Sequence, residues 1–275
     1  MIAWPFLQVL SKGKLSVFLF HKVPLQSDSL VPNDITLAAF EGVLDQIVSK
    51  FRVLPLEDAV KHLQSGRLPR RAACITFDDG YPDWMLGVAP ALRRRNLHAT
   101  FFITSGQFDG VPLWHERILA AVRQLPGPLL DLGIPFLPSQ SVASTEDRRR
   151  QVQRLEHELK YLTLYRREQI LQRLEGEAGV QAVNVPVMSE AQLRDLHSQG
   201  FGIGAHTALH PILDYCSAEE AEYEISGARE RLEAIVRGRV NGFAYPNGRP
   251  YADFSRLHVD VVKRAGYGYA VTTHW

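Results

Sequence analysis

Residues 74–80 of this chain read CITFDDG. Four mostly apolar residues with strand character lead directly into Asp78, Asp79 and Gly80. Two adjacent carboxylates at the end of a buried strand repel each other, and burial penalises the charge on both. One explanation is a solvated turn, because Asp and Gly are common turn residues. The other is a bound cation that neutralises one carboxylate and leaves the second free to act as a base.

Short apolar stretches and helix-like segments alternate along most of the sequence. Strands separated by helices indicate parallel βα units. The apolar stretches are nearly continuous, which suits a sheet buried on both faces. We therefore predict an α/β fold whose strands form a closed or nearly closed barrel. The expected strands are residues 15–20, 74–77, 99–104, 201–205, 242–245 and 267–273, and the expected helices are residues 37–50, 56–63, 88–95, 190–198, 218–236 and 260–265.

Residues 112–187 interrupt this alternation. They contain a segment rich in Pro and Gly, LPGPLLDLGIPFLP at 125–138, and then a charged helix-like stretch at 145–177. We interpret residues 112–187 as a largely helical insertion within a single domain that spans residues 1–275. Their apolar content looks too low for a core of their own.

Composition limits the classes of partner and the location. The chain has 275 residues and a formal net charge of +1, so no overall field attracts nucleic acid. Two distant cysteines, Cys74 and Cys216, do not make a disulfide framework. No apolar run approaches the ~18 residues of a transmembrane helix, and the N-terminus lacks the pattern of a signal peptide. We expect a cytoplasmic protein, leaving open peripheral membrane contact by the first ten residues; the sequence does not predict the oligomeric state.

Four of the apolar stretches end in residues that can do chemistry. One ends in His21, one in the Asp78–Asp79 pair, one in His206 and one in Pro-Asn-Gly at 246–248. In parallel barrels the C-terminal ends of the strands form the rim where active sites assemble. The four endings together predict one convergent site.

The segment from His206 to His210 has the spacing of a metal site. Two histidines four residues apart can place both rings on one side of a helical turn, and two such nitrogens suit one divalent metal. A surface pair is the alternative. A third ligand from the Asp78–Asp79 pair would complete a His-His-Asp set and leave an open position for water or substrate. The metal would acidify the water, and the second carboxylate would accept its proton.

These motifs resemble those of the polysaccharide deacetylase family, also called NodB-homology or carbohydrate esterase family 4 proteins. Residues 76–80 match the family motif TFDDG, and residues 206–210 match H-[ST]-x-x-H in the same order. The resemblance covers residues 15–273 apart from the insertion. It implies a distorted (β/α)7 barrel, related to the TIM barrel, that hydrolyses N-acetyl groups of amino sugars. It also implies a divalent metal ion, Zn2+ first, with Co2+, Ni2+ and Fe2+ as alternatives.

The resemblance also assigns roles by position. It implies that Asp78 is the catalytic base and that Asp79, His206 and His210 bind the metal. These roles answer the question raised by the acidic pair, because the two carboxylates are then not equivalent.

The third family motif is altered in this chain. The family pattern is F-R-P-P-Y-G, whereas residues 243–248 read FAYPNG, with Ala244 in place of the arginine that pairs with the base. Either Asp78 then has a raised pKa or another cation substitutes, and Arg249 is one candidate. The resemblance implies that the backbone N–H of Asn247 stabilises the oxyanion, a role that needs no particular side chain.

An early histidine resembles the acid of one branch of the family. Residues 20–24 read FHKVP, similar to the YH-x-V start of the poly-N-acetylglucosamine deacetylase branch. In that branch the motif order is permuted and the FAYP form of the third motif also occurs. The resemblance implies that His21 is the general acid, in place of the late histidine motif that is absent here. A chain truncated after Trp275 is the alternative explanation for that absence.

Two aromatic residues are candidates for sugar binding. Trp114, next to His115 at the start of the insertion, either lines a sugar subsite or packs in the core. Tyr245 is assigned to the pocket in preference to the core.

We therefore predict a metal-dependent N-acetylglucosamine or polysaccharide deacetylase of exopolysaccharide or cell-wall metabolism. Its partner is an N-acetylated amino sugar in a polymer, an oligosaccharide or a precursor. One alternative is a catalytically degenerate carbohydrate-binding protein, which the missing arginine motivates. Another is a deformylase that acts on a lipid-linked sugar, which fits the absence of a signal-peptide pattern.

Overall fold

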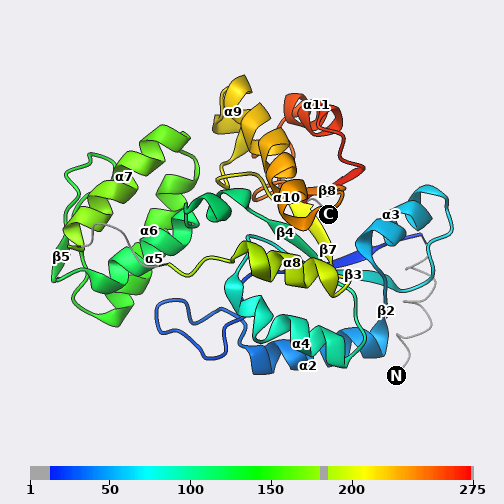
Figure 1. Ribbon diagram of the computed structural model, residues 1–275. Coiled ribbons are helices and arrows are strands. Elements are labelled where there is room, and N and C mark those ends of the chain that lie inside the picture. Colours follow the sequence, from blue (N-terminus) through cyan, green and yellow to red (C-terminus); the bar gives the residue numbers. More distant parts are fainter. Residues whose placement is uncertain (1–12, 180–184, 274–275) are drawn as a thin grey trace.

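The computed structural model of the protein describes residues 13–179 and 185–273. Within these ranges seven strands form one parallel sheet in the order β1–β3–β4–β7–β8–β9, and β2 pairs with the start of β3 (Figure 1). The sheet curls into a partial barrel, and in the described chain β1 and β9 do not pair. The predicted α/β class and distorted (β/α)7 barrel are confirmed. The strands are β1 (Ser16–Phe20), β2 (Arg52–Val53), β3 (Ala72–Phe77), β4 (Thr100–Ile103), β7 (Gly202–Ala205), β8 (Gly242–Ala244) and β9 (Tyr269–Val271).

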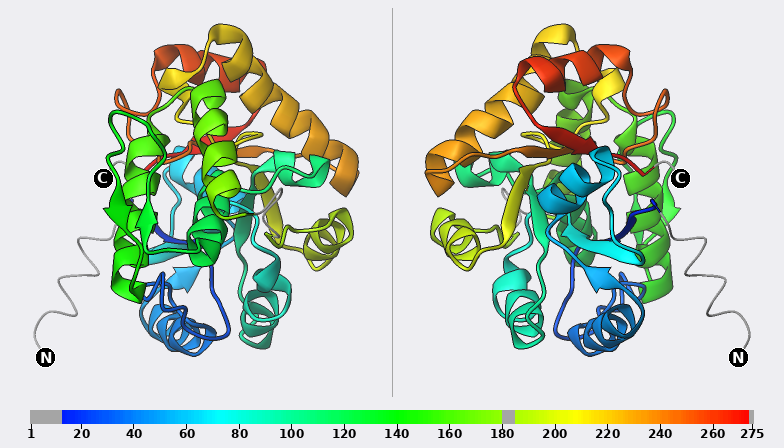
Figure 2. Two further views of the ribbon diagram at one scale, coloured as in Figure 1. Left: turned by 90° about the vertical axis from the view of Figure 1, so that its left-hand side faces the viewer. Right: turned by 90° about the vertical axis from the view of Figure 1, so that its right-hand side faces the viewer.

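Helices lie around the outside of the curled sheet (Figure 2). Local sequence signals set several of their first residues. The hydroxyl of Thr36 accepts a hydrogen bond from the N–H of Ala39 at the start of α2, and Ser189 and Gln192 form a capping box at the start of α8. The helices of the barrel are α2 (Leu37–Lys50), α3 (Leu56–Gln64), α4 (Val88–Arg94), α8 (Glu190–Ser198), α9 (Ala218–Glu222), α10 (Ala228–Val236) and α11 (Arg256–Arg264).

The main hydrophobic core lies between the sheet and these helices. Every residue of β3 is buried, as the sequence predicts for a strand covered on both faces. Helix α2 buries Phe40, Leu44 and Ile47, which share one face at helical spacing. Phe77 at the end of β3 packs against Phe40 with ring centroids 5.7 Å apart. This packing holds the C-terminal end of β3, where the acidic pair begins.

Two strands differ from the expectation. Strand β1 lies at the end of the hydrogen-bonded path, and its Val17 and Leu19 are 41% and 40% exposed, so the prediction of a fully buried strand was wrong there. Strand β2 was missed, because two residues are too short to show any periodicity.

The predicted helix at 218–236 is interrupted by a π-helical turn. Its first part is α9, its last part is α10, and η4 (Tyr223–Gly227) lies between them. A π-helical turn adds a residue to the helical repeat and is often found at functional sites. Its consequence for Glu224 is described below.

The inserted segment forms a helical layer to one side of the sheet (Figure 1). It comprises α5 (Trp114–Gln124), a short hairpin of β5 (Leu129–Leu130) and β6 (Gln140–Ser141), α6 (Thr145–Lys160) and α7 (Leu164–Glu177). The expectation that it lacks a core was wrong, since Ile118, Leu155 and Leu174 are among the members of a separate buried apolar cluster. Its description as an insertion at about 112–187, in a single domain of 1–275, stays a prediction.

No helix in the described ranges is both long enough and apolar enough to cross a bilayer. The expectation of membrane contact by the first ten residues lies outside the described residues.

Candidate metal centre and active-site pocket

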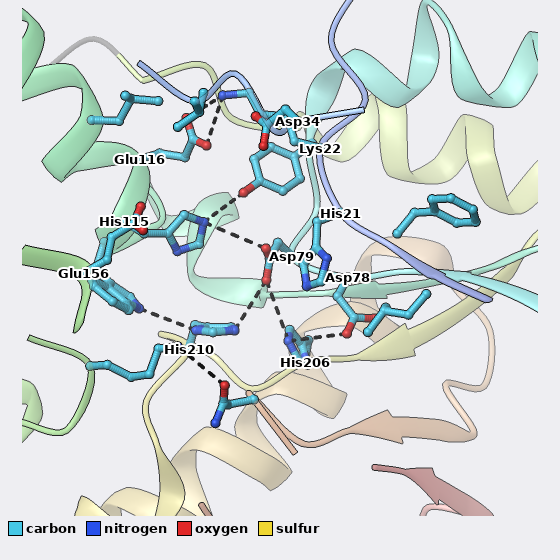
Figure 3. Close-up of a pocket in the computed structure, with 18 of the residues that line it drawn as sticks. His21, Lys22, Asp34, Asp78, Asp79, His115, Glu116, Glu156, His206 and His210 are labelled. Carbon is cyan, nitrogen blue, oxygen red and sulfur yellow. Dashed lines mark hydrogen bonds and ion pairs between the residues drawn. The ribbon is translucent and has the colours of Figure 1, made fainter. Parts of the chain in front are cut away.

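The ends of β1, β3, β7 and β8 meet at one pocket of about 610 Å³ (Figure 3). Helices α5 and α6 of the insertion supply part of its wall. All the residues assigned to the site from the sequence line this pocket, namely His21, Asp78, Asp79, Trp114, His206, His210, Tyr245 and Asn247.

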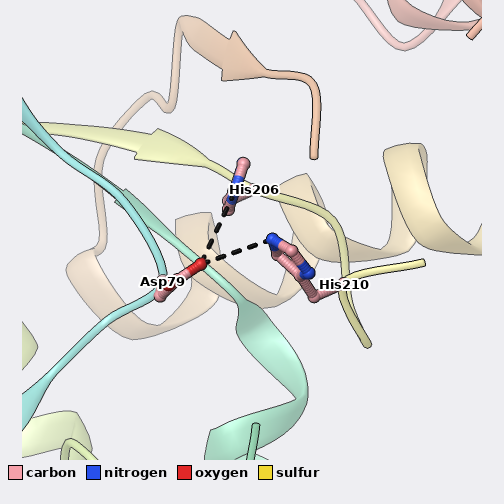
Figure 4. A group of neighbouring side chains, drawn as sticks. All are labelled: Asp79, His206 and His210. Carbon is pink, nitrogen blue, oxygen red and sulfur yellow. Dashed lines mark ion pairs between the residues drawn. The ribbon is translucent and has the colours of Figure 1, made fainter. Parts of the chain in front are cut away.

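Asp79 occupies a turn that holds its carboxylate toward two histidines. Its φ is +87°, a value that residues with a side chain rarely adopt. The carbonyl of Asp79 accepts hydrogen bonds from the side chain of Gln107 at 2.6 Å and from the N–H of Thr104 at 3.1 Å, which fix the turn. Asp79 Oδ1 then lies 3.6 Å from His206 Nε2 and 3.4 Å from His210 Nε2 (Figure 4).

These separations fit a single metal ion. Ligand atoms at ~2.0–2.1 Å in a tetrahedral zinc site are roughly 3.3 Å from one another. One potential ligand atom from each of Asp79, His206 and His210 lies within 4.8 Å of the others. Asp79 Oδ1 is buried and has no hydrogen-bond partner among the described residues. A buried carboxylate oxygen between two imidazole nitrogens is therefore a chemically suitable cation ligand.

The contacts of His206 leave the lone pair of its Nε2 available to bind a metal. Its Nδ1 lies 2.8 Å from the carbonyl of Ala244, so Nδ1 carries the proton and donates it to that oxygen. The Nε2 lone pair then faces Asp79. Burial lowers the pKa of His206, which keeps the ring neutral as ligation requires.

His210 has a second contact on its other ring nitrogen. The indole N–H of Trp114 lies 3.4 Å from His210 Nδ1. That donor favours an unprotonated Nδ1, whereas ligation through Nε2 leaves the proton on Nδ1. The separation exceeds the ordinary N–H hydrogen-bond range of ~2.7–3.2 Å, so this contact is weak. Burial lowers the pKa of His210 well below its usual range.

Asp78 is buried beside this group without a basic partner of its own. Its Oδ2 lies 3.9 Å from His206 Nε2, and its Oδ1 has no hydrogen-bond partner in the described chain. Burial, followed by the charge of Asp79, raises the pKa of Asp78 well above its usual range. Arg249 does not replace the missing arginine, because its guanidinium binds Asp253 at 3.0 Å.

The electrostatics of Asp79 differ from those of its neighbour. Burial alone would raise the pKa of Asp79. The positive charges that His210, His21, His115 and His206 carry when protonated outweigh that effect and lower the pKa of Asp79 below its usual range. The pKa values of the two adjacent carboxyl groups are thus shifted in opposite directions. This is expected if one carboxylate binds a metal and the other acts as a base.

His21 follows β1 and is held by a turn that the sequence did not assign to the site. In η1 (Pro82–Met85), the indole N–H of Trp84 donates to the carbonyl of His21 at 2.9 Å. Asp83 Oδ2 accepts the N–H of Val23 at 3.1 Å. These two bonds fix the backbone from the carbonyl of His21 to the N–H of Val23.

The third-motif turn contributes Asn247 to the lining of the pocket. Asn247 has a φ of +58°, and its side-chain amide donates to Asp253 Oδ2 at 2.7 Å. No described residue accepts a hydrogen bond from its backbone N–H. Tyr245 lines the pocket but its ring is buried and stacks on Phe254 with centroids 3.8 Å apart, so it belongs to the core as well.

The structure adds pocket residues that sequence reasoning did not assign. Tyr81 forms a 2.8 Å hydrogen bond with His115 Nε2, which also lies 3.8 Å from Asp79 Oδ2. The sequence indicated only that His115 is next to Trp114, and it assigned no role to His115. Five further charged residues line the pocket and share no motif: Lys22, Asp34, Glu116, Glu156 and Lys160.

Comparison with known proteins identifies the family. The polysaccharide deacetylase family model matches residues 65–125 and 169–270, more than half of the chain. The chain belongs to the polysaccharide deacetylase family. A chitooligosaccharide deacetylase of Azorhizobium caulinodans is 39% identical over 74 residues, which is 26% of this chain and 33% of that protein. The match therefore spans only about a third of that relative.

Solved structures of low sequence identity share the fold. The Streptococcus pyogenes deacetylase PplD, solved in complex with acetate, superposes with a TM-score of 0.61 at 15% identity, covering 94% of this chain and 84% of that chain. IcaB from Ammonifex degensii superposes with a TM-score of 0.59 at 16% identity, covering 94% and 83%.

Proposed function

We propose that the protein is a metal-dependent hydrolase that removes an N-acetyl group from an amino sugar in a polysaccharide, an oligosaccharide or a precursor. The observation that carries the proposal is the buried Oδ1 of Asp79 between two imidazole nitrogens at 3.4 and 3.6 Å, with the Asp78 carboxylate beside it. Membership of the polysaccharide deacetylase family supports the substrate class.

The candidate metal ligands are Asp79, His206 and His210. Two imidazoles and one carboxylate suit Zn2+, and the same donors accept Co2+, Ni2+ or Fe2+. When bound, such an ion supplies Lewis acidity and lowers the pKa of water at the site.

The remaining polar residues transfer protons and stabilise the oxyanion. Asp78 accepts a proton from the attacking water as the new C–O bond forms. The N–H of Asn247 donates to the developing oxyanion. His21 gives a proton to the nitrogen as the C–N bond breaks, so the products are acetate and a free amine.

The pocket has the size and lining of a sugar site. About 610 Å³ lies within the ~300–1,000 Å³ usual for small-molecule pockets. Trp114, Glu116 and Glu156 are among the residues that line the pocket, and an indole with carboxyl groups is a lining that suits a sugar ring with its hydroxyls.

Acetate release from N-acetylglucosamine oligomers, measured together with bound metal, tests the proposal. We expect about one metal ion per chain and metal-dependent acetate release. Bound metal without acylated-sugar hydrolysis would favour the carbohydrate-binding alternative, which the lack of an arginine partner for Asp78 motivates. Formate release from an N-formylated, lipid-linked amino sugar, in place of acetate release, would favour a deformylase.

The cytoplasmic location stays a prediction from the sequence. Cell fractionation with an antibody against the full chain tests it, and recovery outside the cytoplasm would contradict it.

A further inference from the structure

The loop from His206 to His210 is held in an unfavourable backbone conformation. Thr207 and His210 have φ values of +64° and +54°, a region that residues other than Gly rarely adopt. Surrounding groups must therefore hold the loop. The adjacent segment holds part of it, since the N–H of Ser105 donates to Thr207 and the N–H of Gly106 donates to Ala208.

Glu224 holds the loop from one side. It lies in the π-helical turn η4 and is fully buried. Its Oε2 accepts hydrogen bonds from the backbone N–H groups of Ala208 and Leu209, both at 2.8 Å. One carboxylate oxygen therefore binds two consecutive peptide N–H groups of the loop.

Arg167 holds the loop from the other side. It is buried on α7 of the insertion and donates to the carbonyls of Leu209 at 3.0 Å and His210 at 3.3 Å. Its guanidinium lies over the ring of Trp114 at 4.9 Å, which fixes the side chain. Neither Arg167 nor Glu224 lines the pocket that contains Asp78 and Asp79.

We propose that Glu224 and Arg167 form a two-sided clamp that keeps both imidazoles of the His206–His210 loop facing Asp79. The clamp rests on the proposed metal centre, for which both are positioning residues. Because Arg167 comes from the insertion, the insertion has a role in building the metal site in addition to lining the pocket.

Two clamp variants and two matched controls test this proposal. Glu224→Gln weakens the acceptor and buries an amide NH2 where Oε1 has no partner, and Arg167→Met removes both donors with little change in volume. Glu175→Gln and Arg117→Met are the controls. These two residues are also buried and bind each other at 2.8 Å, with no hydrogen bond to the loop among the described residues.

The first measurement is amide hydrogen exchange of the metal-free protein. We expect faster exchange at residues 206–210 in both clamp variants and wild-type exchange there in both controls. The second is Zn2+ affinity by competition with a chromophoric chelator. Loss of a group that orients a metal ligand costs about 10–100-fold in affinity, so we expect at least a tenfold loss in the clamp variants and less than twofold in the controls.

Unchanged exchange in the clamp variants would overturn the clamp, as would equal losses in the controls, which would indicate general destabilisation. A wild-type protein that fails to bind zinc would overturn the proposed metal centre. The exchange experiment would still decide the clamp in that case, because it uses metal-free protein.

Discussion

At the scale of single residues, Asp78 and Asp79 show how neighbours in sequence acquire different chemistry. Oδ1 of Asp79 faces His206 and His210, whose charges when protonated lower the pKa of Asp79, whereas burial and then the charge of Asp79 raise the pKa of Asp78. Asp79 therefore suits ligation and Asp78 suits proton transfer.

The first prediction separates the two carboxylates. Asp78→Asn should reduce acetate release by about 10²–10⁴, the usual contribution of a general base, because the amide cannot accept the proton of water. Metal content measured by mass spectrometry should stay at the wild-type level. Asp79→Asn should lose the metal itself. Full turnover by the Asp78 variant would remove that residue from the mechanism.

The second prediction concerns Glu156 in the pocket wall. Burial raises the pKa of Glu156 from 4.5 to about 7, although Lys160 acts in the opposite sense. Between these values the folded state binds more protons than the unfolded state, so the free energy of unfolding falls as the pH rises from 4.5 to 7. Glu156→Gln should remove this contribution, on the order of 3 kcal/mol, and flatten the pH dependence.

Urea unfolding at several pH values measures the effect of Glu156→Gln. Glu146→Gln is the control, because it removes the same charge from an exposed position on the same helix. Parallel pH profiles for wild type and Glu156→Gln would contradict the prediction.

At the scale of elements, close packing against η2 determines the path of the His206–His210 loop. Gly106 in η2 (Ser105–Asp109) donates its N–H to Ala208, and a Cβ at this glycine would lie 2.7 Å from the Ala208 carbonyl oxygen. Glycine is therefore required there by the approach of the two backbones, independently of its φ.

The third prediction follows from this contact. Gly106→Ala should lower the free energy of unfolding by about 1–3 kcal/mol, because overpacking shifts the backbone. Gly42→Ala on α2 is the matched control: its Cβ would meet no atom within 4 Å, and Ala favours a helix interior over Gly by about 1 kcal/mol. Denaturant unfolding compares the two variants, and equal stability changes of the same sign would contradict the steric argument.

At the scale of the whole molecule, the candidate metal site joins parts of the chain that are far apart in sequence. Its candidate ligands follow β3 and β7, and the insertion and η4 hold one of the two ligand loops. An ion that binds only the folded arrangement stabilises the entire fold by linkage, by ~2.7 kcal/mol at a free concentration one hundred times the dissociation constant.

The fourth prediction uses that linkage. Removing metal with a chelator should lower the Tm of the wild-type protein, and added Zn2+ should restore it. His206→Ala removes a ligand and should show no zinc-dependent shift. An equal shift in both proteins would place the ion elsewhere.

Signals within single segments were sufficient for much of the fold. Helix α2 spans the residues expected from its apolar spacing, and β3 was recognisable because both of its faces are buried. The candidate ligands were also recognisable, because TFDDG and HTALH each place their chemistry within five consecutive residues.

Only the tertiary structure decided what depends on residues from separate segments. Arg249 binds Asp253 instead of Asp78, the insertion has its own apolar cluster, and Arg167 and Glu224 meet at one loop. A sequence pattern records which side chains share a face of one helix or strand. It does not record which distant backbone groups need partners, because that requirement arises only when the segments pack together.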